Sequence, residues 1–214
     1  MNESTNYLLQ YHDLILSIVA AMEARDFYTA CHSMRVAEMT EALCGYLGLN
    51  EDERTLYHIA AHLHDLGKIG IEDSVLRKTS NLSEKEWVLM KEHPKIGYNI
   101  LHKIDSFEEI SKIVRAHHER WDGKGYPDKL IGNEIPFGSR IITVADSIDA
   151  MLSTRPYRKE MSPTVCKSEI NRNIGTMYAP DIARTAIENW DDLLLRRNAV
   201  CVIEIENHYA GTSI

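Results

Sequence analysis

The chain has 214 residues, a formal net charge of −8 and 44% hydrophobic residues. This size and apolar content fit one domain with a core and exclude an intrinsically disordered chain. A net acidic chain is not a general binder of DNA or RNA polymers, and no apolar run approaches the roughly 20 residues that cross a bilayer. Because the N-terminus lacks the basic region and cleavage site of a secretory signal, the sequence predicts a cytoplasmic protein without a membrane segment.

Apolar residues recur at spacings of three and four over most of the chain, which is the pattern of amphipathic helices. Gly48 is typical of a left-handed helix stop, and Asn50 is a preferred N-cap for the helix that follows. Ser83 and Glu86 have the spacing of a capping box. The first half of the chain is therefore predicted to form helices over 8–24, 29–47, 50–65, 83–92, 94–103 and 107–116.

The second half begins with a segment rich in glycine, proline and charge, which spans residues 119–138. It is too long for a plain connection, and loops of this length are often functional. Helical spacing resumes over 141–152, and Ser162 followed by Pro163 predicts the start of a further helix.

The C-terminal part carries one long helical pattern that starts at Pro180 and ends near Arg196. The tail over 199–205 alternates weakly and could form a short β-strand. Since neither a linker nor an internal repeat is visible, the sequence predicts an all-α protein with a single helical bundle. Its expected parts are an N-terminal helix over 1–25, the main domain over 26–198 and a C-terminal tail over 199–214.

Imidazole and carboxylate side chains lie on or at the ends of several predicted helices. His64 and Asp65 are adjacent at one helix end, so both can point at one spot, and a carboxylate can bridge two cations. Donors of this kind, without thiolates, favour a catalytic divalent site over a structural zinc site. Two metals about 3.5–4 Å apart would use all the candidates. The seven candidate ligands are His32, His64, Asp65, His93, His117, His118 and Asp146.

Each of these residues also has an ordinary structural explanation. A single histidine on an apolar helix is more often a core or surface residue than a ligand, and His–Asp pairs occur by chance. Taken together, the order and the flanking residues of the seven favour a metal site. The remaining histidines lack such flanks and are predicted not to bind metal: His12, His58, His62, His102 and His208.

Four ordered motifs resemble the HD-GYP domain, a branch of the HD metal-dependent phosphohydrolases. They are HLHDLGKIGI at 62–71, KEHPKIG at 91–97, HHERWDGKGYP at 117–127 and RIITVADSIDAMLSTRPYRK at 140–159. The resemblance covers about residues 26–190. It implies an HD-type helical bundle that hydrolyses cyclic di-GMP to pGpG, GMP or both.

Carried over position by position, the resemblance implies a two-metal site in which Asp65 bridges the cations. One metal would be held by His32, His64, Asp65 and Asp146, and the other by Asp65, His93, His117 and His118. A hydroxide bridging both cations would attack phosphorus. Lys68 would lie beside the substrate phosphate as a clamp or proton donor. Iron or manganese is expected, and cobalt, nickel and zinc also suit these ligands.

The resemblance also implies contacts to the substrate. Arg155 and Arg158 would grip phosphates through forked hydrogen bonds, with a solvated basic cluster as the alternative. Asp149 is predicted in the substrate region, where it either orients a ligand histidine or lies on the helix surface. Tyr126 could stack on guanine or anchor its own loop to the core.

Two positions depart from the family pattern. Some members hold a third metal with a glutamate four residues before the first ligand histidine, where this chain has Tyr28. A site with two metals is therefore predicted. A Phe-Asp-Pro triplet of the family is replaced by Tyr178, Ala179 and Pro180, a change that removes no ligand.

The leading hypothesis from the sequence is a cyclic di-GMP phosphodiesterase, and two alternatives stand beside it. One is a phosphohydrolase for another cyclic dinucleotide or nucleotide, such as cyclic GMP-AMP. The other is a signalling module that binds a cyclic dinucleotide or a partner without catalysis. Such a module would be expected to lose ligands. The family also includes members that bind diguanylate-cyclase domains, so the loop over 119–136 is a candidate partner surface, and a homodimer is left open.

Overall fold

The computed structural model of the chain describes residues 12–25, 31–154 and 159–200 in full, and the backbone of 201–210. Its α-helices are α2 (His12–Glu23), α3 (His32–Tyr46), α4 (Glu51–Leu63), α5 (Asp73–Leu76), α6 (Glu84–Met90), α7 (His93–Leu101), α8 (Glu108–Ala116), α9 (Phe137–Leu152), α10 (Pro163–Arg172), α11 (Pro180–Glu188) and α12 (Trp190–Ala210). Short 3₁₀ helices are η1 (Leu66–Gly70), η2 (Asp105–Phe107) and η3 (Gly132–Glu134). None of the described helices has the length and apolar character needed to span a membrane.

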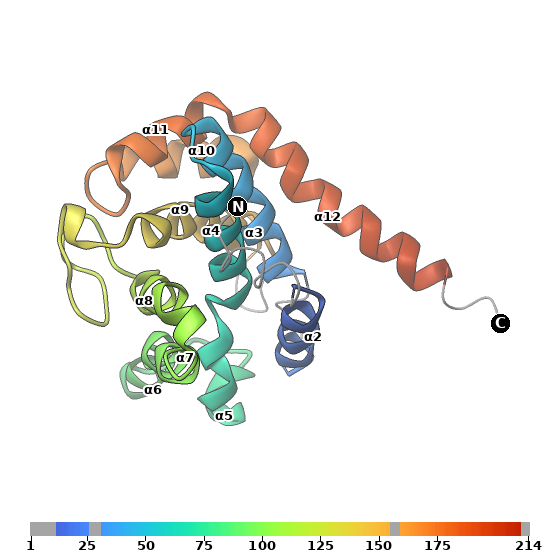
Figure 1. Cartoon of the computed structure of the whole chain (residues 1–214), viewed down its shortest axis with the longest axis vertical. Helices are drawn as coiled ribbons and strands as arrows, with labels where there is room; N and C mark the ends of the chain where they lie inside the picture. The colour runs from blue at the N-terminus through green and yellow to red at the C-terminus, as the bar shows by residue number, and fades with distance from the viewer. Residues whose placement is uncertain (1–11, 26–30, 155–158, 211–214) are drawn as a thin grey trace.

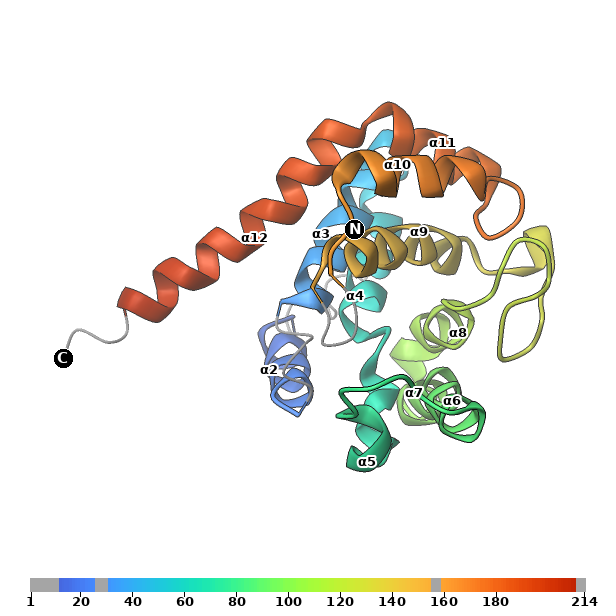
Figure 2. The same cartoon turned by 180° about the vertical axis from the view of Figure 1, so that it is seen from behind.

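Helices α3, α4 and α9 lie in the middle of the bundle, as Figures 1 and 2 show from opposite sides. Helices α10 and α11 lie at one end and α5, α6 and α7 at the other, while α12 extends away from the body (Figure 1). Helix α3 packs against α4, α9 and α12, and α7 packs against η1 and α8. Buried side chains such as Val36, Ile59 and Ile148 join these helices in one continuous core, so the all-α bundle predicted from the sequence is confirmed.

Helix α2 belongs to the same core, because Ile15, Val19 and Met22 are buried in it and the helix packs against α4. At the end of α2, the Glu23 carboxylate accepts hydrogen bonds from the backbone N–H groups of Cys31 at 3.2 Å and Ser33 at 3.0 Å. The first N–H groups of a helix have no partner within it and need an outside acceptor. Glu23 thus caps α3 from another helix.

Local signals in the sequence placed several helix ends correctly. Asn50 accepts a hydrogen bond from the backbone of Glu53 at 3.0 Å, and Ser83 forms the predicted capping box with Glu86. Gly48 has the left-handed backbone expected of a helix stop, with φ +73°. These signals act over three or four residues, which is why they can be recognised without the fold.

Two predictions about the C-terminal part are wrong. The segment from Pro180 forms two helices instead of one, because the backbone turns at Asn189, whose side-chain amide donates to the Thr185 carbonyl at 2.9 Å. The strand considered for 199–205 is instead a continuation of α12, while the domain boundaries expected from the sequence stay predictions. A strand needs a paired neighbour for its backbone groups, and the described residues contain no strand to pair with.

Candidate metal centre

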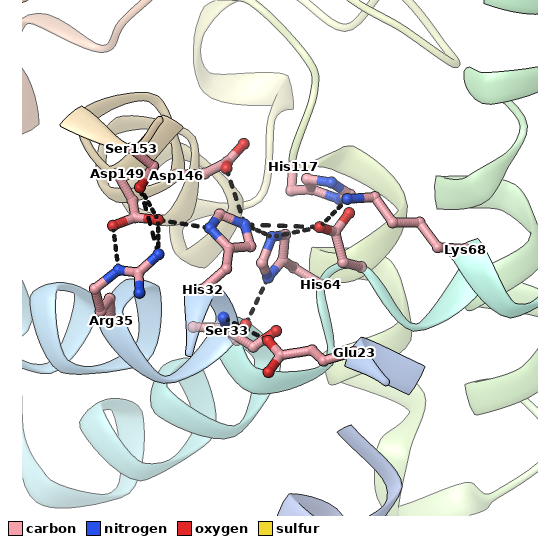
Figure 3. A network of polar contacts seen from close by, with 12 residues as sticks. Glu23, His32, Ser33, Arg35, His64, Lys68, His117, Asp146, Asp149 and Ser153 are labelled. Carbon is pink, nitrogen blue, oxygen red and sulfur yellow. Dashed lines mark hydrogen bonds and ion pairs between the residues drawn. The ribbon is translucent and has the colours of Figure 1, made fainter. Parts of the chain in front are cut away.

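Three of the predicted ligands meet where α3, α4 and α9 come together. His32 begins α3, His64 follows the last turn of α4, and Asp146 lies within α9. The Nε2 atoms of His32 and His64 are 3.3 Å apart, and His32 Nε2 is 3.4 Å from Asp146 Oδ1. Figure 3 shows these side chains turned toward one another. Their ligand atoms all lie within 4.8 Å of one another, an arrangement that can hold a cation.

The other four predicted ligands form a second group beside the first. His93 begins α7, and His117 and His118 follow the last turn of α8. His93 Nε2 lies 3.3 Å from His117 Nε2 and also 3.3 Å from Asp65 Oδ1. Together with His118, these residues place four ligand atoms within 4.8 Å of one another.

Asp65 belongs to the second group and also faces the first. Its Oδ1 atom faces His93, while its Oδ2 atom lies 3.4 Å from His64 Nε2 and 3.7 Å from His32 Nε2. A carboxylate in this position can give one oxygen to each of two cations. The structure therefore brings all seven candidate side chains together, in two groups joined at Asp65.

Three of the imidazoles are oriented by backbone carbonyl groups one turn earlier in the chain. The pairs are His64 Nδ1 with Ala61 O at 2.6 Å, His93 Nδ1 with Met90 O at 2.8 Å, and His117 Nδ1 with Val114 O at 2.6 Å. A carbonyl oxygen only accepts, so Nδ1 carries the proton and Nε2 presents its lone pair to the site. Metal-binding histidines are usually fixed in this way, and the donor set fits divalent cations.

The carboxylates of the site are held in their ionised form. Burial would raise the pKa of Asp65, but Lys68 and the neighbouring imidazoles outweigh burial and hold this pKa well below its usual range. Burial would also raise the pKa of Asp146, and His32 outweighs it in the same way. Both carboxylates thus carry the negative charge that attracts a cation.

The imidazoles differ in protonation. Burial lowers the pKa of His118 to about 3, and it also lowers the pKa of His93 and His117, so these rings are neutral. Burial would lower the pKa of His32 too, but hydrogen bonds to Asp146 and Asp149 raise it to about 9. Since only a deprotonated nitrogen binds metal, a cation would take the place of the proton that His32 shares with Asp146.

The sequence model of the family described as HD domain matches residues 17–182, which is most of the chain. The chain belongs to the HD domain family. The resemblance to HD-GYP domains is confirmed by the family match and by the relatives. The chain is 34% identical over 187 residues to the 3'3'-cGAMP-specific phosphodiesterase 2 of Vibrio cholerae, an alignment that covers 86% of this chain and 36% of the relative.

A second relative is a cyclic di-GMP phosphodiesterase of Thermotoga maritima, 36% identical over 188 residues that cover 85% of this chain and 51% of the relative. This chain thus spans between about a third and half of the length of these two relatives. Among solved structures, a Vibrio cholerae phosphodiesterase described as specific for cyclic GMP-AMP has the same fold. Its TM-score is 0.69 at 18% identity, over 91% of this chain and 52% of that one.

Close backbone packing between η1 and α7 brings the two groups of candidate ligands together. We call the seven side chains of these two groups the HD centre. A Cβ atom added at Gly67 would lie 1.8 Å from the His93 carbonyl oxygen and 2.5 Å from the Gly97 nitrogen. No side chain fits in so little space, so this contact requires glycine. The contact places the start of α7, and with it His93, beside Asp65.

Lys68 and Tyr126, two of the predicted substrate residues, lie beside the HD centre. Lys68 Nζ is 2.7 Å from Asp65 Oδ2, and 18% of its side chain is exposed. The ring of Tyr126 packs on the ring of His118 with centroids 4.8 Å apart, and its backbone N–H donates to the His118 carbonyl at 3.2 Å. Arg155, Arg158 and Tyr28 lie outside the described residues.

Asp149 holds His32 in place, as Figure 3 shows. Its Oδ2 atom accepts from His32 Nδ1 at 2.8 Å, and its Oδ1 atom accepts from Arg35 Nε and Arg197 Nε, each at 2.7 Å. The carboxylate is fully buried. This placement favours the role of orienting a ligand histidine over direct contact with a substrate.

Sequence reasoning did not find Arg35 and Arg197 as members of this network. Arg35 follows His32 by three residues and shares its helix face, so the spacing offered a signal. Arg197 is 48 residues from Asp149 and carried no local signal that would connect the two.

Glu119, which sequence reasoning also left without a role, organises the loop over 119–136. Its buried carboxylate accepts from the backbone N–H groups of Asp128 at 2.6 Å, Lys129 at 3.0 Å and Leu130 at 3.2 Å. The loop therefore closes on the residue that directly follows His118. The expected binding of diguanylate-cyclase domains by this loop, and the homodimer, stay predictions.

Proposed function

We propose that this HD domain is a metal-dependent phosphodiesterase for cyclic dinucleotides that hydrolyses cyclic di-GMP to pGpG, GMP or both. The observation that carries the proposal is Asp65, whose two oxygens face two separate groups of ligand atoms. Relatives named for cyclic di-GMP and for cyclic GMP-AMP support the reaction class. They also make cyclic GMP-AMP the second substrate to test.

The proposed cofactor is a pair of divalent cations. We assign one to His32, His64 and Asp146 and the other to His93, His117 and His118, with Asp65 giving one oxygen to each. Iron and manganese are the expected metals, because imidazole and carboxylate ligands suit both. When bound, such a pair neutralises phosphate charge and lowers the pKa of a coordinated water.

The protein side chains would position the phosphodiester and move protons. Lys68 reaches Asp65 from a partly exposed position, so its ammonium group can turn to a non-bridging phosphate oxygen or donate a proton to the departing ribose oxygen. Tyr126 and Asp149 would keep His118 and His32 in place. Arg155 and Arg158 remain proposed phosphate contacts, since guanidinium groups bind phosphate oxygens in pairs.

The test is turnover of cyclic di-GMP and 3'3'-cGAMP by anaerobically purified protein loaded with iron or manganese, with linear products separated by chromatography. We expect His64→Ala to lower the rate about a thousandfold or more, because several kcal/mol of charge stabilisation depend on an intact centre. His102→Ala is the matched control, since His102 is exposed and its ring stacks on Tyr98 away from the ligand groups.

Two results would contradict the proposal. Equal rates for His64→Ala and the unaltered protein would remove the link between the centre and hydrolysis. Tight binding of a cyclic dinucleotide, with no product formed whichever metal is loaded, would instead support a signalling module that binds without catalysis.

A further inference from the structure

A second cluster of histidines lies on the other side of α4, where this helix packs against α2. It consists of His12 at the start of α2 and of His58 and His62, one turn apart on α4. The sequence predicts that none of the three binds metal, because none has the flanking residues of a metal site. The structure brings them side by side, with one ring nitrogen of each within 4.8 Å of the others.

The spacing of these nitrogens suits a single cation. The Nε2 atoms of His58 and His62 lie 3.1 Å apart. Two nitrogens bound tetrahedrally at about 2.0–2.1 Å from zinc are about 3.3 Å from each other, so the helical pair already has nearly the required separation. The His12 ring completes a triangle, with its centroid 5.6 Å from that of His58 and 5.5 Å from that of His62.

The surroundings of the cluster also favour a cation. His62 is only 3% exposed, and its Nδ1 atom has no hydrogen-bond partner among the described residues. Glu38 and Glu41 on α3 act electrostatically on His58 and favour positive charge at that ring. Three partly buried imidazoles close together offer the nitrogen donors that borderline transition metals prefer.

We propose that His12, His58 and His62 form a further metal site, a three-imidazole site for zinc or a similar borderline transition metal, with a fourth position open to water. The site joins α2 to α4, whereas the proposed catalytic pair is held by α3, α4 and α7–α9 together with Asp65. Its ligands are all imidazoles with no carboxylate among them, so it differs from the HD centre in donor set as well as in place.

A bound cation at this site would hold α2 on the bundle. Helix α2 ends at Glu23, which caps α3 next to His32 through the Cys31 and Ser33 backbone N–H groups. The three-imidazole site would therefore stabilise the helix that supports the first ligand of the HD centre. We assign it a structural role because its ligands come from two different helices, so metal binding at the cluster would be coupled to the docking of α2 on α4.

The experiment counts zinc ions. The protein is equilibrated with zinc, freed of excess by desalting and analysed for metal per chain, together with His12→Gln and His12→Cys. We expect His12→Gln to retain one zinc ion fewer than the unaltered protein and to keep its phosphodiesterase rate with manganese. His12→Cys should restore the lost ion, because a thiolate also binds zinc. His102→Gln is the control for removal of a histidine elsewhere.

A second measurement distinguishes the loss of a zinc ligand from misfolding of the variant. Circular dichroism of the metal-free variants should match that of the unaltered protein, and thermal unfolding with added zinc should shift less for His12→Gln and His58→Gln. The proposal is overturned if His12→Gln and His58→Gln both retain as much zinc as the unaltered protein, and with the same affinity. The cluster is then a packed histidine group only. If the protein retains the third zinc ion but does not hydrolyse cyclic dinucleotides, only the proposed function is contradicted.

Discussion

Helix α4 supplies histidines to two different clusters, and the two are built differently. His64, just after its last turn, joins the HD centre, where a backbone carbonyl holds its Nδ1 atom and two aspartates supply charge. His62 joins the three-imidazole cluster, where its Nδ1 atom has no hydrogen-bond partner among the described residues and all the candidate ligand atoms are imidazole nitrogens. Oriented ligands bind metals about 10–100-fold more tightly, so we expect the HD centre to hold its cations more strongly.

The two clusters are also assembled in different ways. The HD centre depends on close backbone packing and a buried charged network, and its proposed ligands come from five helices and the turns that follow them. The three-imidazole cluster needs only one helical turn and the docking of α2. Changes to the supporting residues should therefore damage the first cluster and spare the second.

The largest effect is expected from Gly67→Ala. The added methyl group would overlap the His93 carbonyl oxygen, so η1 and α7 must separate and His93 moves away from Asp65. We expect unfolding free energy to fall by about 3 kcal/mol or more and hydrolysis to be lost. Urea denaturation and turnover of cyclic di-GMP measure the two effects.

Gly45→Ala is the matched control for this change. Gly45 lies in α3, and outside this helix an added Cβ would meet, among the described residues, only Arg54 Cζ at 4.0 Å. Alanine should stabilise this helix by about 0.5–1 kcal/mol. A small, similar effect of both substitutions would show that the close contact at Gly67 is not needed.

An intermediate effect is expected from Asp149→Asn. Loss of the carboxylate leaves Arg35 and Arg197 without their common buried acceptor and removes the partner of His32 Nδ1. We expect metal affinity at the group containing His32 to fall about 10–100-fold, with about 3 kcal/mol lost from stability. Metal titration by calorimetry would measure the first quantity.

The control for Asp149 is Asp191→Asn on the exposed side of α12, where loss of the charge should change metal affinity little. Retention of full metal affinity in Asp149→Asn would argue against a positioning role. In both variants the zinc ion assigned to the three-imidazole cluster should remain.

The smallest effect is expected from Glu119→Gln. The amide keeps one acceptor oxygen but loses the charge that holds the N–H groups of Asp128, Lys129 and Leu130. We expect about 1–3 kcal/mol lower stability and a higher KM with a nearly unchanged kcat. Glu134→Gln, which removes one exposed carboxylate contact to the Ile131 backbone N–H, should cost less than about 1 kcal/mol. Equal thermal shifts for the two variants would show that Glu119 does not organise the loop.

The sequence predicted the candidate ligands of the HD centre better than the residues that hold those ligands in place. All seven candidate ligands could be named, because they lie in ordered motifs at helix ends. The arginines that hold Asp149 could not be named, because Arg197 reaches Asp149 only after α12 has packed against α3. Glu119 bonds residues nine to eleven positions away in a loop whose path no local pattern describes.

By itself the sequence determined what acts over short distances in the chain: the helical spacing, the caps at Asn50 and Ser83, and the donors that could hold metal. The tertiary structure decided which donors meet. It divided the seven candidate ligands into two groups joined at Asp65, and it brought His12 to His58 and His62, although nothing in the flanking residues connects them. The physical reason is that caps depend on neighbours within one turn, whereas a cation site depends on how distant helices pack.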